Sequence, residues 1–338
     1  MSHKKLVQWL LAWFARDARD LPWRRTLDPY AIWVSEIMLQ QTQVRTVVPY
    51  WERWMRAVPN VAALARARPE KLHKLWEGLG YYARVRNMQK AARVIVVAHG
   101  GRFPVGFEDI LALPGVGRYT AGAICSIALN QPRPILDGNV IRVLTRLFGV
   151  AGNPRGKETN ARLWQLSEEM VEEAAKSDGS RRNTTRASTA NGAQGRSCAP
   201  TPRSCHPGAC SRFNQSLMEL GALICTPRQP RCGACPVAKC CLARAQGRVH
   251  EFPEAVRRAA VTPRRFVAIV AEKRGRFLVR RRPAGVVNAH LWEFPNYELG
   301  KDERDAKGRV KAEFECAGRA LEPLCTISHS ITRYRITL

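Results

Sequence analysis

The sequence has few acidic residues and no apolar run long enough to cross a membrane, so we expect no membrane partner. Its 338 residues include 28 Asp and Glu against 55 Lys and Arg, which gives a formal net charge of +27. A chain this basic attracts polyanions and associates with them faster, so nucleic acid is a candidate partner. A basic protein from an Arg-rich, high-GC genome would have the same excess, so charge alone leaves both explanations open. With 45% apolar residues, the chain can bury one large core or two domains.

One segment of the sequence lacks a strand pattern, and another lacks large apolar residues. Residues 1 to about 175 have no alternating strand pattern, and their Pro, Gly and Asn residues predict helices joined by turns. Residues 176–207 have almost no large apolar residue, and Ser, Thr, Asn, Gly, Arg and Pro dominate them. Such a stretch cannot bury enough surface to offset its ordering entropy, so we expect a disordered insertion.

Residues 1–14 have the outline of a signal peptide, with basic residues ahead of an apolar run. However, Leu6, Trp9, Leu10 and Trp13 fall at helical spacing, and the run passes directly into charged residues. This pattern predicts an amphipathic first helix.

The sequence pattern changes from about Thr262 onward. Residues 265–271 and 276–282 are two β-rich runs around a turn at 273–275, which predicts a hairpin. Residues 328–338 predict a third strand. We therefore expect a separate α+β domain after a linker.

Most of the eleven cysteines gather in residues 198–241, and four of them have the spacing C-x6-C-x2-C-x5-C: Cys225, Cys232, Cys235 and Cys241. Four thiolates from one compact loop can hold an iron–sulfur cluster. They can also hold a zinc ion, although zinc sites use shorter, paired spacings. Either centre requires a reducing compartment rather than a disulfide framework. Because Cys240 adjoins Cys241, the fourth ligand is assigned by spacing alone.

The string Leu113-Pro114-Gly115-Val116-Gly117 predicts a tight glycine turn between two helices. Glycines permit a sharp turn and a close approach of another chain. Backbone N–H groups of Gly115, Val116 and Gly117, at the start of the second helix, can bind a phosphate. The string resembles a helix–hairpin–helix, a motif that clamps DNA without reading its sequence; a plain turn between two helices is the alternative.

Two carboxylates are candidates for catalysis. Asp137 follows Gly117 by twenty residues, at a position where it can cap the helix that begins there. Glu36 is the single carboxylate in the apolar run 30–39, and burial would raise its pKa, which suits a general acid near neutral pH. A position on the exposed face of its helix is the alternative for Glu36.

Several longer strings resemble the adenine DNA glycosylase (MutY) family of the helix–hairpin–helix, endonuclease III-like superfamily. The resemblance runs from about residue 6 to 246 and is carried by residues 20–24 (DLPWR), 33–42 (WVSEIMLQQT), 76–82 (WEGLGYY), the hairpin, 140–144 (VIRVL) and the cysteine loop. It implies a mostly α core with a [4Fe-4S] cluster at the four cysteines. It also implies a monofunctional DNA N-glycosylase of base-excision repair, acting on double-stranded DNA with adenine opposite 8-oxoguanine or guanine.

The resemblance implies a division of labour between the two carboxylates. Glu36 would protonate N7 of an extruded adenine, while ionised Asp137 would stabilise an oxocarbenium-like sugar. Tyr119 and Asn139 would orient nearby groups. Endonuclease III-like lyases carry a Lys where this chain has Tyr119, and a phenol cannot form the Schiff base of strand cleavage.

Further residues are assigned to substrate binding by the same resemblance. The adenine pocket would be lined by Leu21, Trp23, Arg24, Val44, Gln215 and Met218, with ordinary core packing as the alternative for Leu21 and Trp23. Contacts or a wedge beside the opposing base would come from Gln41, Thr42, Leu79 and Tyr81.

The resemblance also implies a domain plan. We expect a glycosylase core at 1–246, with a helical barrel at about 22–130 and a cluster subdomain from 1–21 and 131–246, then a linker at 247–261 and a Nudix-like lesion-recognition domain at 262–338. Residues 291–295 (LWEFP) resemble the Nudix framework, but the paired-glutamate box is absent, so pyrophosphatase activity is not expected.

The lesion-recognition loop departs from the family pattern. Where the family has Phe-Ser-His, this chain has Ile331-Thr332-Arg333, in which Thr332 retains a hydroxyl for 8-oxoguanine. Because the chain stops at Leu338, we expect the sheet of this domain to be incomplete.

Two other functions stay open at this point. One is another monofunctional helix–hairpin–helix glycosylase, for instance one that removes thymine from G·T mismatches. The other is a catalytically impaired remnant that binds DNA without turnover. We expect a monomer, cytoplasmic and nucleoid-associated if bacterial, and nuclear or organellar if eukaryotic.

Overall fold

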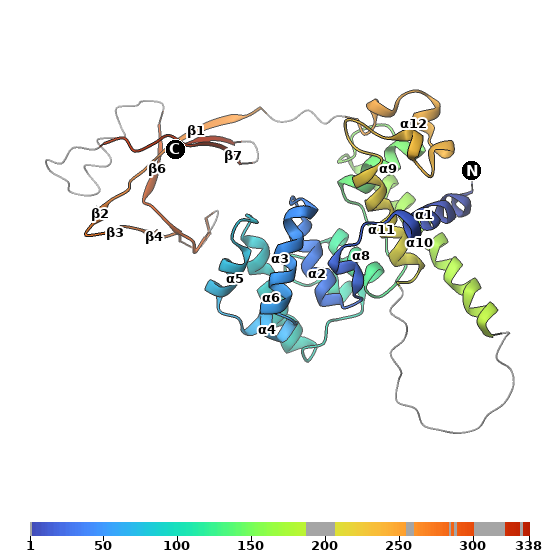
Figure 1. Cartoon of the computed structure of the whole chain (residues 1–338), viewed down its shortest axis with the longest axis horizontal. Coiled ribbons are helices and arrows are strands. Elements are labelled where there is room, and N and C mark those ends of the chain that lie inside the picture. Colours follow the sequence, from blue (N-terminus) through green and yellow to red (C-terminus); the bar gives the residue numbers. More distant parts are fainter. Residues whose placement is uncertain are drawn as a thin grey trace, which may run out of the picture. The chain divides into compact units, whose positions relative to one another are not determined.

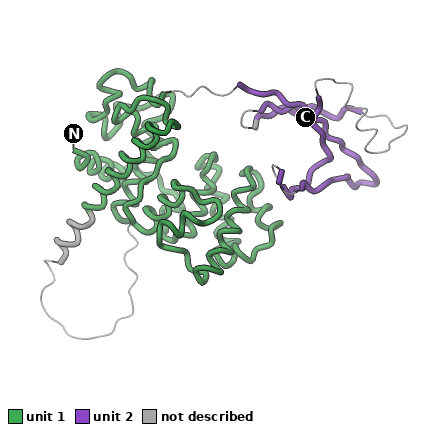
Figure 2. Tube along the Cα trace, turned by 180° about the vertical axis from the view of Figure 1, so that it is seen from behind, with its two compact units in different colours: residues 1–255 green, residues 256–338 purple. Residues whose placement is uncertain are grey.

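The computed structural model describes residues 2–186, 207–254, 260–283, 285–286, 289–300, 322–331 and 334–338. The chain divides into two compact units, Met1–Ala255 and Val256–Leu338, which Figure 2 colours separately. In the described residues, unit 1 is helical and unit 2 is built from strands. The change of pattern near Thr262 therefore correctly predicted a second, strand-bearing part.

Unit 1 is a succession of helices joined by short turns, as its lack of alternating apolar residues predicted (Figure 1). Its described α-helices are α1 (His3–Asp17), α2 (Pro29–Leu39), α3 (Val44–Ala57), α4 (Val61–Arg66), α5 (Pro69–Trp76), α6 (Ala83–Ala98), α7 (Phe107–Leu111), α8 (Arg118–Ile127), α9 (Gly138–Phe148), α10 (Lys157–Arg186), α11 (Ala209–Leu223) and α12 (Leu242–Ala245). Short 3-10 helices are η1 (Pro22–Arg25), η2 (Cys232–Ala234), η3 (Ala238–Cys240) and η4 (Val249–Glu251).

Polar side chains mark where several helices begin. Asp28, Asn60 and Asp137 each accept a hydrogen bond from a backbone N–H in the first turn of α2, α4 and α9. Such a cap contributes about 1 kcal/mol. Helix α9 is capped at its C-terminal end by Gly149, whose φ of 60° is a left-handed conformation that glycine adopts readily. Asp137 thus lies at a fixed point at the start of α9.

Two hydrophobic cores hold unit 1 together. The first gathers side chains from η1 to α8 around the fully buried Trp33, Trp54 and Trp76. The second gathers α1 with α9, α10 and α11, so the first helix packs on helices from much later in the sequence. Helix α2 contributes to both cores, with Ile32 in the second and Trp33 in the first. Helix α2 therefore lies where the two cores meet.

Helix α1 is amphipathic, as the spacing of its apolar residues predicted. Leu6, Leu10 and Trp13 are buried in the second core, whereas Trp9 is exposed. No helix in the described part of the chain is long and apolar enough to cross a membrane.

Two predicted boundaries in unit 1 need correction. Helix α10 continues to Arg186, so a described helix extends into the segment that we expected to be a disordered insertion. The earlier turns of α10 are anchored in the second core, and a nucleated helix propagates with one hydrogen bond per added residue. The remainder of the expected insertion, up to residue 206, lies outside the described residues.

The linker begins later than predicted. Phe252 is buried, and its carbonyl oxygen accepts a hydrogen bond from Nε of Arg146 at 2.9 Å. Residues from 247 to Ala255 therefore belong to unit 1. The polar composition of this stretch did not reveal that one aromatic residue anchors it.

Unit 2 contains a four-stranded sheet in the order β6-β1-β8-β7. Strand β1 is antiparallel to β6 and parallel to β8, and β8 is antiparallel to β7. Two further pairs are β2–β3 and β4–β5. The strands are β1 (Thr262–Ala268), β2 (Glu272–Lys273), β3 (Arg276–Phe277), β4 (Arg280–Arg281), β5 (Trp292–Glu293), β6 (Asn296–Leu299), β7 (Ser328–Ile331) and β8 (Tyr334–Thr337).

The predicted hairpin in unit 2 is only partly right. The turn at Arg274 and Gly275 joins β2 to β3. However, β1 pairs with β6 and β8, because a strand with an apolar run gains more from two neighbours than a hairpin offers. Residues 328–338 form two strands rather than one. The described residues of unit 2 contain no helix, and residues 301–321 lie outside them.

Candidate active site

A cavity of about 500 Å³ opens between η1, α2, the start of α9 and α11. All four residues predicted to be catalytic line it: Glu36, Tyr119, Asp137 and Asn139. So do most of those predicted to bind the substrate: Leu21, Trp23, Arg24, Gln41, Thr42, Val44, Gln215 and Met218. Residues separated by up to almost two hundred positions in the sequence thus meet in one place.

Glu36 is buried on α2 rather than on an exposed helix face, with 5% of its surface accessible. The hydroxyl of Tyr119 donates a hydrogen bond of 2.7 Å to Oε2 of Glu36. Burial raises the pKa of Glu36 from 4.5 to about 7; the bond from Tyr119 opposes this rise, and the nearby charge of Asp137 adds to it. A carboxyl of this kind can donate a proton near neutral pH.

Asp137 caps α9 and lines the same cavity. Its Oδ1 accepts from the Val140 backbone N–H at 2.7 Å, and its Oδ2 accepts from Nδ2 of Asn139 at 2.9 Å. Burial raises the pKa of the Asp137 carboxyl above its usual range, and both hydrogen bonds oppose that rise. The helix cap and the candidate catalytic group are therefore the same side chain.

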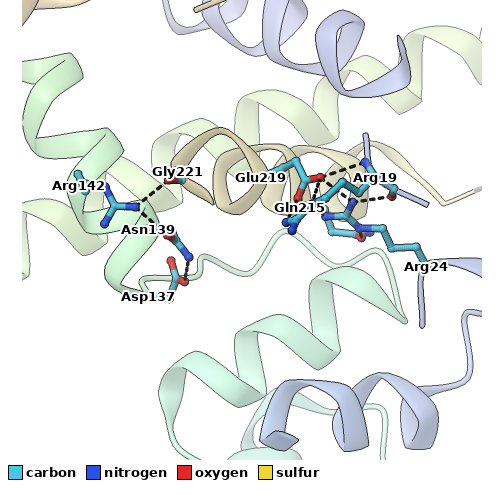
Figure 3. Close-up of polar contacts among 8 residues, drawn as sticks. All are labelled: Arg19, Arg24, Asp137, Asn139, Arg142, Gln215, Glu219 and Gly221. Carbon is cyan, nitrogen blue, oxygen red and sulfur yellow. Dashed lines mark hydrogen bonds and ion pairs between the residues drawn. The ribbon is translucent and has the colours of Figure 1, made fainter. Parts of the chain in front are cut away.

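Asn139 is held from the opposite side by Arg142. One guanidinium nitrogen of Arg142, Nη2, donates to Oδ1 of Asn139 at 2.8 Å and to the Gly221 carbonyl at 2.7 Å (Figure 3). Its Nε donates to the Cys225 carbonyl at 2.6 Å. A Cβ atom on Gly221 would lie 2.6 Å from Cβ of Asn139, so the absent side chain lets α11 approach α9.

The residues Arg19 and Glu219 line the cavity and were not predicted from the sequence. Glu219 is 1% exposed and accepts hydrogen bonds from the guanidinium groups of Arg19 and Arg24 at 2.6 to 3.2 Å (Figure 3). Burial would raise the pKa of Glu219, but these bonds outweigh it and hold the pKa at about 2. Arg24 also donates to Oε1 of Gln215 at 3.1 Å. The available signal was a lone carboxylate on the apolar helix α11, one turn after Gln215.

The predicted opposing-base residues occupy two turns. Gln41 and Thr42 follow α2 and line the cavity. Leu79 and Tyr81 follow α5 and are not part of its lining; Leu79 is buried, and Tyr81 is 48% exposed. Gln41 and Tyr81 have φ angles of 56° and 47°, a left-handed conformation that costs a non-glycine residue about 1–2 kcal/mol. Thr332 lies outside the described residues.

The predicted hairpin forms the turn between α7 and α8. Gly115 has a φ of 78°, and a Cβ atom there would lie 2.6 Å from Cβ of Asn87. Gly117 caps α8 with its backbone. The N–H of Val116 donates to the Leu113 carbonyl at 3.0 Å, so this amide is engaged within the turn.

The four cysteines with the distinctive spacing surround one small cavity of about 30 Å³. Cys225, Cys232, Cys235 and Cys241 line it, and the neighbouring Cys240 does not. The described residues contain no group of three or more His, Cys, Asp or Glu placed to hold a single metal ion. The buried Arg146 donates from Nη1 to Sγ of Cys225 at 3.4 Å and to the Thr226 carbonyl at 2.8 Å. The cavity is therefore lined by Cys241, the cysteine that the spacing selected, and not by Cys240.

Comparison with known proteins defines the class of the helical unit. Residues 34–169 match the family model of the HhH-GPD superfamily of base excision DNA repair proteins. This segment carries Glu36, the hairpin, Tyr119, Asp137 and Asn139.

Among curated proteins, an adenine DNA glycosylase of Rattus norvegicus is 41% identical over 256 residues, covering 72% of this chain and 43% of the relative. One from Buchnera aphidicola subsp. Schizaphis graminum is 32% identical over 292 residues, covering 86% of this chain and 74% of the relative. The chain belongs to the adenine DNA glycosylase family. It spans less than half the length of the mammalian relatives, 43% for the rat protein and 38% for the human one.

Solved structures agree on the fold of unit 1. A thermostable thymine-DNA glycosylase matches with a TM-score of 0.57 and 28% identity, covering 72% of this chain and 97% of that one. Endonuclease III in a non-covalent DNA complex matches with a TM-score of 0.51 at 17% identity, which supports the shared fold alone.

Proposed function

We propose that the protein is an adenine-specific DNA glycosylase of base-excision repair that hydrolyses the N-glycosidic bond of adenine opposite 8-oxoguanine or guanine. The observation that carries the proposal is the presence in one cavity of two carboxylates in different surroundings. Glu36 is buried with a pKa of about 7, whereas Asp137 accepts two hydrogen bonds that oppose the rise burial causes in its own pKa. Membership of the adenine DNA glycosylase family supports the choice of base.

In the proposed reaction, the target adenine is extruded from the duplex into the cavity, whose volume of about 500 Å³ exceeds that of a purine base. Glu36 gives its proton to N7, which makes adenine a better leaving group. Ionised Asp137 stabilises the positive charge that develops on the sugar, and a water molecule then completes hydrolysis. The two carboxyl groups therefore have separate tasks because their surroundings differ.

Tyr119 and Asn139 are positioning residues in this proposal. The Tyr119 hydroxyl orients the carboxyl of Glu36, and the Asn139 amide orients that of Asp137. Because Tyr119 has no amine, it forms no Schiff base with the abasic sugar. The enzyme is therefore monofunctional and leaves the DNA strand intact.

We further propose that Cys225, Cys232, Cys235 and Cys241 hold a [4Fe-4S] cluster. The donor set fits, because four thiolates from one loop converge on one cavity and Cys ligands are those that such clusters use. When bound, the cluster would cross-link the loop rather than take part in hydrolysis. Arg228, Arg231 and Lys239 of the same loop are then available to DNA phosphates.

The remaining binding roles follow the same proposal. The turns at Gln41–Thr42 and Leu79–Tyr81 would contact the opposing base. The adenine would be enclosed by Leu21, Trp23, Arg24, Val44, Gln215 and Met218. The backbone N–H groups of Gly115 and Gly117 would contact the DNA backbone, whereas that of Val116 donates to the Leu113 carbonyl within the turn. Unit 2 would act as a Nudix-like lesion-recognition domain, with Thr332 facing 8-oxoguanine. The active form is proposed to be a monomer.

A single-turnover assay tests this function. The substrates are duplexes with one adenine opposite 8-oxoguanine or guanine, and one with thymine opposite guanine. The proteins are wild type, Glu36→Gln and, as a matched control, Glu52→Gln at an exposed position on α3. We expect free adenine from wild type and the control, with strand breaks only after alkali, and none from Glu36→Gln. Thymine release would favour the mismatch rival, and tight binding without any base release would leave a DNA-binding protein.

A further inference from the structure

Two turns of unusual backbone geometry lie next to each other beside the candidate active site. The turn after α2 contains Gln41 and the turn after α5 contains Tyr81, both with positive φ angles that non-glycine residues rarely adopt. The second turn also contains Gly78 and Gly80 at φ angles of 95° and 66°. Local preference does not favour the conformations of Gln41 and Tyr81, so surrounding contacts must hold them.

Arg84, on the first turn of α6, makes those contacts with both turns. Its Nη1 donates to the carbonyls of Ile37 and Gln40 at 2.9 and 2.7 Å, at the end of α2. Its Nη2 donates to the carbonyls of Leu79 and Gly80 at 2.8 and 3.2 Å, in the turn after α5. One planar guanidinium therefore bonds to the backbone of two separate segments.

Aromatic contacts fix the plane of this guanidinium. The central carbon of Arg84 lies 5.3 Å from the ring centre of Trp76 and 5.7 Å from that of Tyr81. The ring nitrogen of Trp76 donates to the Gly80 carbonyl at 3.0 Å, and the Tyr50 hydroxyl donates to the Glu77 carbonyl at 2.6 Å. The turn after α5 is thus supported by its own neighbours, and Arg84 couples it to the turn after α2.

No other side-chain type reproduces this arrangement. The guanidinium presents several N–H donors in one rigid plane, whereas a lysine amine is a compact group on a flexible stem. A lysine at position 84 keeps the charge but cannot point donors at carbonyls of both turns in the same fixed plane. Arg84→Lys therefore separates the effect of the planar link from the effect of charge.

We propose that Arg84 is a positioning residue that sets the placement of Gln41–Thr42 relative to Leu79–Tyr81, and so determines how the enzyme discriminates the base opposite the adenine. This inference rests on the proposed glycosylase function. Arg84 does not line the adenine cavity. Its effect therefore falls on the way the rate depends on the base opposite the adenine. The chemistry at Glu36 and Asp137 proceeds without Arg84.

The test compares single-turnover adenine release from two duplexes that differ only opposite the adenine. One carries 8-oxoguanine and the other a tetrahydrofuran abasic analogue, which offers the turns no base. The proteins are wild type, Arg84→Lys and Arg84→Gln. The control is Arg93→Lys, an exposed residue on the same helix that bonds only weakly, at 3.4 Å, to the Ala65 carbonyl. Thermal unfolding is measured for each.

We define the rate ratio as adenine release opposite 8-oxoguanine divided by release opposite the abasic analogue. For Arg84→Lys we expect this ratio to fall by about tenfold or more, since misplacement by about 1 Å can cost a hundredfold in rate. Release opposite the abasic analogue should stay within about threefold of wild type. Arg84→Gln, which can reach one turn at most, should show the same fall and serves as the test if the lysine variant does not fold. Arg93→Lys should keep the wild-type ratio.

Two results overturn the inference: two unchanged rates, or an equal fall of both rates, which would indicate a general structural role. Failure of the proposed function is recognised separately, because the wild type would then release adenine from neither duplex.

Discussion

The burial of Glu36 makes the stability of unit 1 depend on pH, and Glu36→Gln should remove that dependence. The pKa of the folded carboxyl is about 7 and its ordinary value is 4.5. Between these pH values the folded protein holds a proton that the unfolded chain has lost. Stability is therefore fully present below pH 4.5 and decreases as the pH rises through about 7.

The size of the effect follows from the same pKa values. Since each tenfold change in proton affinity is worth about 1.4 kcal/mol, the rise from 4.5 to about 7 costs about 3 kcal/mol above pH 7. Glutamine avoids this cost and still accepts the Tyr119 hydrogen bond, but its buried amide donor loses about 1 kcal/mol. We expect Glu36→Gln to match wild type near pH 5 and to be more stable by about 2 kcal/mol near pH 8.

Urea unfolding followed by far-ultraviolet circular dichroism measures this difference, because the signal reports the helices of unit 1. The exposed Glu52→Gln substitution should change stability by less than about 0.5 kcal/mol at either pH. Adenine release by Glu36→Gln should fall by at least about a hundredfold. If wild type and Glu36→Gln differ equally at both pH values, the argument from a buried carboxyl is refuted.

Three further substitutions test neighbouring contacts. The Tyr119 hydroxyl lowers the pKa of Glu36, and its hydrogen bond is worth about 1 kcal/mol. Tyr119→Phe should therefore shift the alkaline limb of the pH–rate profile to higher pH by about 0.7 unit. An unshifted limb would contradict this. Cys225→Ser should lose bound iron in elemental analysis whereas Cys240→Ser keeps it, and equal iron contents would count against the assignment of the four ligands. Glu219→Gln leaves Arg19 and Arg24 without their buried carboxylate partner. The free energy of unfolding, measured in urea at neutral pH, should therefore decrease by about 3 kcal/mol or more. An unchanged free energy of unfolding would mean that water replaces the carboxylate.

Spacing and composition predicted local features of this site, whereas its pocket residues and catalytic roles were assigned by the resemblance to the adenine DNA glycosylase family. The apolar run around Glu36 predicted burial, and the position of Asp137 before a helix predicted a cap; both predictions are confirmed. The glycine string at 113–117 predicted the turn between α7 and α8. These features depend on a few neighbouring residues, so a single sequence contains them.

Features that depend on distant partners were missed. Glu219 gains its role from Arg19 and Arg24, some two hundred positions earlier, and no local pattern announces that pairing. The link from Arg84 to two separate turns is of the same kind. In unit 2, the segments flanking the turn near Gly275 pair only close to that turn, in β2 and β3, because β1 takes β6 and β8 as its neighbours instead.

The missing side chain of Gly221 has a consequence for attempts to engineer a sturdier version of this protein. Replacing glycine by alanine inside a helix is a usual stabilising substitution, gaining about 1 kcal/mol from backbone propensity. On α11 the added methyl group would lie 2.6 Å from Cβ of Asn139 and 2.9 Å from its carbonyl oxygen. The substitution that strengthens the helix would therefore displace the amide that holds Asp137, so a sturdier helix would come with a weaker catalyst.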